Sequence, residues 1–211
     1  MEPRGAPEFI LEAFADPNSV RDVVRGILNL IFFLRFFPTV PPRTRDVLGL
    51  DLAYVAEDEI ETLIEQRVTT LVRQLEAERS QPHHANHSLQ HASSGSGNGG
   101  SGRGQVAVKF FEKRRRKAWY PLRSDDEVCW ENWVIKVTVA DPKTEGERAK
   151  VRKATVTTLN NTVFKIITLV NAHKDHIPPI TTTDSNPFPY EININPHKSA
   201  ESGWAARIGI Y

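Results

Sequence analysis

The stretch FFEKRRRKAWYPLRSDDEVCWENWVIKVTV, residues 110–139, decides the fold of this chain. Its last part is typical of a strand with one buried face, because large apolar residues recur at every second position. Those residues are Trp133, Ile135, Val137 and Val139. Residues 105–113 form a second strand pattern, rich in β-branched and aromatic residues. We therefore predict two neighbouring antiparallel strands joined by the long loop between them.

Three long helices are predicted around this pair of strands. Residues 17–36 are apolar on nearly every side, which indicates a central helix, and Asp16 as N-cap with Pro17 marks its start. Residues 57–79 carry apolar residues at spacings of three and four, with acidic residues in the first turn. A third helix is expected over residues 144–173. Further strands are expected at residues 8–15, 47–56 and 189–194, so the fold class is α+β.

The third predicted helix has two unlike faces. The face that we expect to be buried carries Val156, Leu159, Val163, Ile166, Ile167 and Val170. The opposite face is small and nearly uncharged, and it carries Ala154, Thr157, Thr158 and Asn161. Small residues let a second helix approach closely, and interface cores are depleted of charge. This strip is our predicted partner-binding surface; the alternative is that its Thr and Asn side chains simply face water.

Length, charge and cysteine content narrow the class of protein. The 211 residues predict one domain spanning residues 1–211, with a flexible Gly/Ser/His-rich loop at about residues 80–104. Lys plus Arg number 27 against 26 Asp plus Glu, so no global field attracts nucleic acid. The most apolar run, residues 27–37, is shorter than the roughly 20 residues that span a bilayer. One cysteine excludes an internal disulfide, and we expect a cytoplasmic protein with no transmembrane segment.

Signatures of catalysis are missing from the sequence. It contains no GxxxxGK[ST], HExxH, GxSxG or CxxC motif. A GxGxxG match at residues 95–100 stands in a polar tract, without the preceding strand and following helix that a nucleotide site needs. We therefore predict a non-enzymatic protein with no catalytic residue, no cofactor and no metal site. Cys129 is expected to pack in the sheet, while His173 and His176 are expected to cap the third helix.

The loop within residues 110–139 holds a second candidate binding site. Large apolar residues stand there between two charged runs, a pattern typical of exposed interface anchors. They are Trp119, Tyr120, Pro121 and Leu122. The alternative is that Trp119 and Tyr120 fold back onto the sheet. The basic run at residues 114–117 could contact RNA, but a solvated loop explains it better, because acidic residues soon offset its charge.

Residues 110–139 resemble the signature region of the autophagy-related protein 101 family. In that family an aromatic and basic strand leads to an exposed Trp loop, an acidic turn and a Trp-x-x-Trp strand. The matching parts here are Phe110–Phe111, residues 114–117, Trp119, residues 124–127, and Trp130 with Trp133. The opening EFILEAFADPNSVRDVVRGIL (residues 8–28) and the segments 170–180 and 190–194 are also similar. The resemblance implies a HORMA domain in the open state, with three long helices packed on a central antiparallel sheet.

The resemblance also implies a function. Family members are scaffolds or adaptors of the autophagy-initiation kinase complex at the phagophore assembly site. They pair with the HORMA domain of autophagy-related protein 13, stabilise it, and recruit downstream factors through the exposed loop, called the WF finger. Only Trp119 matches the usual Trp-Pro-Phe of that finger, so Tyr120 or Leu122 must supply the second anchor. The alternative function is a HORMA adaptor in checkpoint or chromosome-axis assembly, although the short Pro/Asn-rich tail suits a seat belt poorly.

Overall fold

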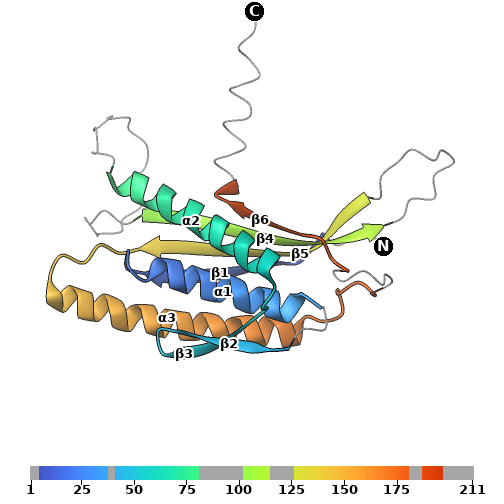
Figure 1. The fold of residues 1–211 in the computed structure, drawn as a ribbon, viewed down its shortest axis with the longest axis horizontal. Coiled ribbons are helices and arrows are strands. Elements are labelled where there is room, and N and C mark those ends of the chain that lie inside the picture. Colours follow the sequence, from blue (N-terminus) through green and yellow to red (C-terminus); the bar gives the residue numbers. More distant parts are fainter. Residues whose placement is uncertain (1–4, 38–40, 81–101, 115–125, 181–186, 197–211) are drawn as a thin grey trace, which may run out of the picture.

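The computed structural model describes residues 5–37, 41–80, 102–114, 126–180 and 187–196. These residues form three helices and six strands (Figure 1). The helices are α1 (Val20–Arg35), α2 (Asp58–Ser80) and α3 (Glu145–Ala172). The strands are β1 (Glu8–Ala15), β2 (Arg43–Val47), β3 (Leu50–Tyr54), β4 (Gly102–Arg114), β5 (Asp126–Val139) and β6 (Tyr190–Ile194). The α+β class expected from the sequence is confirmed.

The main sheet has the strand order β1-β5-β4-β6. Strand β4 runs antiparallel to both β5 and β6, as the sequence predicts for β4 and β5. Strand β1 runs parallel to β5, so the expectation of a wholly antiparallel sheet is wrong at this edge. Parallel neighbours require a long crossover, and the chain supplies one because α1, the β2–β3 hairpin, α2 and β4 all intervene between β1 and β5.

The predicted inward positions of β5 are confirmed. Trp133 and the three alternate residues after it are all buried. The alternation has two exceptions: Val134 is buried as well, and a β-bulge shifts the β4–β5 register between Phe110 and Phe111. An extra residue in one strand re-aims the side chains beside it. Trp130 and Glu131 are therefore both buried although they are neighbours in sequence.

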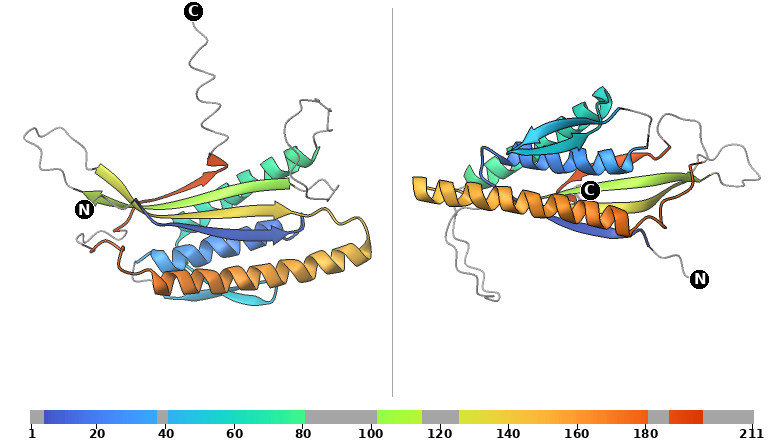
Figure 2. Two further views of the ribbon diagram at one scale, coloured as in Figure 1. Left: turned by 180° about the vertical axis from the view of Figure 1, so that it is seen from behind. Right: turned by 90° about the horizontal axis from the view of Figure 1, so that it is seen from below.

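Helices α1 and α2 cover one face of the sheet, whereas α3 runs along its β1 edge (Figure 2). The carbonyls of the odd-numbered residues of β1 face β5, since those of Pro7 and Ala15 accept hydrogen bonds from the N–H groups of Asn132 and Ala140. The carbonyls of the even-numbered residues therefore point away from β5. One of those outward carbonyls, on Glu12, accepts a 2.7 Å hydrogen bond from Thr162 Oγ1 of α3. None of the described helices lies on the opposite face of the sheet, which we call the outer face.

A β-hairpin replaces the single strand expected at residues 47–56. Strands β2 and β3 are joined through Leu48 and Gly49, both with positive φ (56° and 86°). A two-residue type I′ hairpin turn needs positive φ at both positions, and Leu rarely adopts it, so the sequence pattern did not predict this turn. The hairpin packs on α1 at Gly26, where an added Cβ would lie 3.1 Å from the side chains of Val47 and Leu52.

The ends of the helices depart slightly from the predicted ones. Asp16 is not the N-cap of α1; its Oδ1 instead accepts from the backbone N–H groups of Asn18 and Ser19 in a turn just before the helix. Helix α2 extends through Ser80 and β4 begins at Gly102, so the predicted loop at residues 80–104 is too long at both ends. Residues 81–101 lie outside the described part of the chain.

Candidate partner-binding surface

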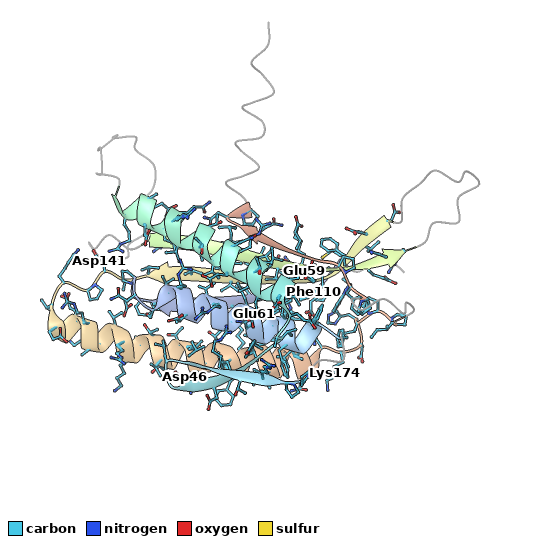
Figure 3. All side chains as sticks on the ribbon, in the orientation of Figure 1. Asp46, Glu59, Glu61, Phe110, Asp141 and Lys174 are labelled. Carbon is cyan, nitrogen blue, oxygen red and sulfur yellow. The ribbon has the colours of Figure 1, made fainter. Side chains whose placement is uncertain are left out.

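Helix α3 begins with a complete capping box. The Thr144 hydroxyl accepts from the backbone N–H of Glu147, and the Glu147 carboxylate accepts from the N–H of Thr144. A second backbone donor, the N–H of Lys143, also reaches that carboxylate at 2.7 Å. These backbone hydrogen bonds hold the pKa of Glu147 below its usual value. Figure 3 labels Asp141 and Lys174, which flank the two ends of the helix.

The buried face of α3 is narrower than the sequence suggests. Leu159, Ile166 and Val170 are buried as predicted, and Thr155 and Thr162 join them. Val156 and Val163 are only half-buried. Ile167 is 40% exposed, so its predicted place in the core is wrong. The helix lies against a strand edge rather than across a sheet face, and an edge covers a narrower stripe of side chains.

An exposed apolar strip follows from this placement. Phe164 is 62% exposed, more than any other large apolar side chain in the described residues, and Ile167 lies one turn along the helix from Val163. We call Val156, Val163, Phe164 and Ile167 the α3 strip. Phenylalanine left in water is energetically unfavourable, and an exposed apolar patch is typical of a surface that a partner covers.

The four partner-binding residues predicted from sequence all lie at the surface of α3. Ala154, Thr157 and Asn161 are exposed, and Thr158 is half-buried. The Thr157 hydroxyl donates to the Lys153 carbonyl, so its hydrogen bonding is satisfied within the helix. Thr157 and Asn161 border the α3 strip, seven and three residues before Phe164. Ala154 and Thr158 turn toward the sheet and line a cleft on its outer face.

A buried polar cluster fixes the C-terminal end of α3. The Glu131 carboxylate, completely buried, accepts from Arg35 Nε at 2.9 Å and from Trp133 Nε1. His176 Nε2 lies 2.7 Å from the same carboxylate. Arg35 also donates through Nη2 to the carbonyl of His173, the residue that caps α3. We call Arg35, Glu131 and His176 the Glu131 cluster; it ties α1, β5 and the segment after α3 together.

Of the two histidines predicted to cap α3, one does so and the other does not. His173 caps α3 as expected: its backbone N–H donates to the Leu169 carbonyl at 2.9 Å, and its ring Nδ1 lies 3.1 Å from that oxygen. His176 takes no part in the cap and contacts Glu131 instead. The sequence held a signal for this carboxylate, because Glu131 shares the strand parity of the buried Trp133.

The remaining predicted residues have mixed outcomes. Trp119, Tyr120, Pro121 and Leu122 lie outside the described residues, between the ends of β4 and β5. Cys129 is half-buried in the sheet, as predicted, and its Sγ donates to the Glu131 carbonyl. Burial raises the pKa of the Cys129 thiol, which disfavours the reactive thiolate. Within the described ranges, no group of three or more His, Cys, Asp or Glu side chains could hold a metal ion.

The described helices include none that is long and apolar enough to cross a membrane. The feature that the structure does supply is a surface, an exposed apolar strip on a long helix that is capped at both ends. Surfaces of this kind define a protein-interaction domain.

Comparison with known proteins places this domain in a family. The family model for autophagy-related protein 101 matches residues 12–184. Autophagy-related protein 101 of Arabidopsis thaliana is 25% identical over 208 residues, covering 89% of this chain and 84% of the relative. The Schizosaccharomyces pombe protein of the same name is 25% identical over 188 residues, with the same coverage. The human one is 32% identical over 108 residues, 46% of this chain. The chain belongs to the autophagy-related protein 101 family and acts in autophagy.

Proposed function

We propose that this protein is a HORMA-domain scaffold of autophagy initiation that works without enzymatic activity. In this proposal it pairs with the HORMA domain of autophagy-related protein 13, stabilises it, and joins the autophagy-initiation kinase complex in the cytoplasm at the phagophore assembly site. Three helices and a mixed sheet are compatible with a HORMA domain. The family membership supports the autophagy role.

The α3 strip is the observation that carries the pairing proposal. Its centre, Phe164 and Ile167, exposes large apolar area on a helix held at both ends. Thr157 and Asn161 supply small, uncharged neighbours, and Ala154 and Thr158 border the contact on the sheet side. A buried phenylalanine in an interface core acts as an anchor, while charge depletion around it avoids desolvation of ions. The partner's HORMA domain is therefore expected to cover this side of α3.

A charge placed in the α3 strip tests the pairing. We expect Phe164→Asp and Ile167→Glu each to weaken binding of the autophagy-related protein 13 HORMA domain by more than tenfold, the equivalent of about 1.4 kcal/mol. Isothermal titration calorimetry with the purified partner domain measures this. The matched control is Ile10→Glu, because Ile10 is 41% exposed on the outer face of β1, almost the same as Ile167.

The circular dichroism spectrum of every variant should equal that of the wild type. Binding that survives both α3 changes, or that Ile10→Glu weakens equally, contradicts the assignment of the surface. If no variant and no wild-type protein binds the partner domain, the pairing itself is wrong.

Recruitment of downstream factors is proposed for the loop that carries Trp119, Tyr120, Pro121 and Leu122. This rests on the family resemblance and on the large apolar residues between charged runs. The double change Trp119→Ala and Tyr120→Ala is expected to leave partner binding intact but to abolish recruitment of downstream factors in cells. Surface substitutions usually alter stability by about 0.5 kcal/mol or less, so a fall in melting temperature of more than a few degrees would place these residues in a core.

A further inference from the structure

A cleft of about 670 Å³ opens where the outer face of the sheet meets α3. Its floor comes from the C-terminal half of β1, the adjoining part of β5 and the first residues of β4. Its wall comes from α3, where Ala154 and Thr158 are small enough to leave the space open. The side chains that shape its chemistry are Glu12, Phe14, Arg103, Lys136, Thr138 and Thr158.

Strand alternation places the floor side chains on the outer face. Ala13 and Val137 are buried beneath the helices, so their neighbours Glu12, Phe14, Lys136 and Thr138 point the other way. The register sets Lys136 opposite Glu12, and Thr138 opposite both Phe14 and Arg103. Arg103 and Lys136 are thus diagonal neighbours across the β4–β5 pair, within reach of one ligand group.

Two cations converge here without an internal partner. Arg103 and Lys136 are exposed, and neither forms an ion pair with any residue that the structure describes. Among the described residues that line the cleft, Glu12 is the only carboxylate, so their cations outnumber their anions two to one. Phe14 is half-buried beside them and offers an aromatic surface. The Thr138 and Thr158 hydroxyls can donate to an anion as well as accept.

We propose that this cleft binds an acidic peptide segment, with a carboxylate on Arg103 and Lys136 and an adjacent apolar side chain on Phe14. Arginine presents a planar fork that matches a carboxylate, and lysine adds a point charge from a second direction. The ladder bonds beneath the cleft are already formed between β1, β5 and β4, so the ligand is read by side chains and does not join the sheet. The cleft adjoins the partner contact proposed for α3 at Ala154 and Thr158, whereas Arg103, Lys136 and Phe14 lie outside that contact.

The probe is a short acetylated and amidated peptide of alternating Glu and Leu residues, titrated into the ¹⁵N-labelled full-length chain. We expect amide shifts at residues 12–14, 103–104, 136–138 and 154–158, saturating at millimolar peptide. The same peptide with Gln in place of Glu should bind at least about tenfold more weakly, because the charge pairing is lost. Added salt should weaken the acidic peptide and leave the neutral one unchanged.

Charge reversal locates the site. The double change Arg103→Glu and Lys136→Glu should abolish the shifts, whereas Lys109→Glu should keep them. Lys109 lies on the same outer face of β4, six residues or roughly 20 Å from Arg103. Equal binding of the acidic and neutral peptides, or shifts that survive the double reversal, would overturn the proposal. A third result would also overturn it: the wild type binds no peptide, and the double reversal loses binding of autophagy-related protein 13. The cleft would then belong to the partner interface.

Discussion

At the scale of single residues, Glu131 joins parts of the chain that are far apart in sequence. Its carboxylate contacts Arg35 from α1, Trp133 from its own strand and His176 from the segment beyond α3. The bulge between Phe110 and Phe111 makes room for this inward carboxylate beside Trp130. A buried ion pair is expensive to desolvate, but removing one partner leaves the other charge buried and unpaired. The cluster therefore fixes one arrangement of the three segments.

Replacing this carboxylate should be strongly destabilising. We expect Glu131→Gln to lower the free energy of unfolding by about 3 kcal/mol, since Arg35 would remain buried without a counter-charge. With a urea m-value of about 2 kcal/mol/M, the unfolding midpoint falls by roughly 1.5 M. The control is Glu127→Gln on the same strand, where the side chain is exposed and the expected change is about 0.5 kcal/mol or less. Equal midpoints for the two variants would show that the cluster contributes no stability.

At the scale of elements, α2 and β4 meet closely where the chain leaves one and enters the other. A Cβ added at Gly104 would lie 2.7 Å from the end of the Leu71 side chain, so a larger residue there would have to displace that side chain. At Gly102 the equivalent position is 3.5 Å from the Leu75 carbonyl oxygen and 3.7 Å from Arg79 Cγ. The first residue of β4 therefore lies beside the last turns of α2, and a short connection can join them.

Shortening the connection should be tolerated. Replacing residues 82–100 with a six-residue Gly/Ser linker is expected to raise the free energy of unfolding slightly, by about 1 kcal/mol, because each halving of a loop saves about 0.6 kcal/mol of closure entropy. Thermal unfolding and partner binding measure the outcome. A same-length Gly/Ser replacement separates the effect of sequence from that of length. Insoluble protein, or a melting temperature several degrees lower, would mean that these residues contribute contacts of their own.

At the scale of the whole molecule, the core is continuous. One cluster contains buried apolar residues from all three helices, from β2 and β3, and from the main sheet. Trp133, Phe32 and Phe110 are among its largest members. Strand β6, which comes last in the described part of the chain, contributes Ile192 to the same cluster. Because the described residues share one core, we expect them to unfold in a single step.

Equilibrium unfolding in urea tests this continuity. Far-ultraviolet circular dichroism reports the helices, while tryptophan fluorescence reports the surroundings of the buried Trp130 and Trp133. The two curves should coincide, with one midpoint and one m-value. Two separate midpoints would show that part of the sheet or the hairpin opens by itself.

The sequence predicted those elements whose pattern is local. Helix α2 and the inward face of β5 follow from periodicity alone, and their boundaries differ by few residues from the observed ones. The β2–β3 turn was missed because Leu48 hides a positive φ. The parallel placement of β1 and the exposure of Ile167 were missed for one shared reason. Both depend on contacts between segments far apart in the chain, and a sequence pattern shows that an element has a buried side without showing what lies against it.

The position of α3 along β1 also limits how copies of this protein could polymerise. Unpaired sheet edges are templates on which other chains can stack, and a sheet with two open edges can propagate indefinitely into fibres. Here the Thr162 hydroxyl and the bulk of α3 occupy the β1 side. Among the described elements, β6 is the edge of the main sheet that has neither a strand nor a helix alongside it. Edge-to-edge stacking through this sheet can therefore join two molecules β6 to β6, and the resulting two-fold pair has no open edge from which to grow.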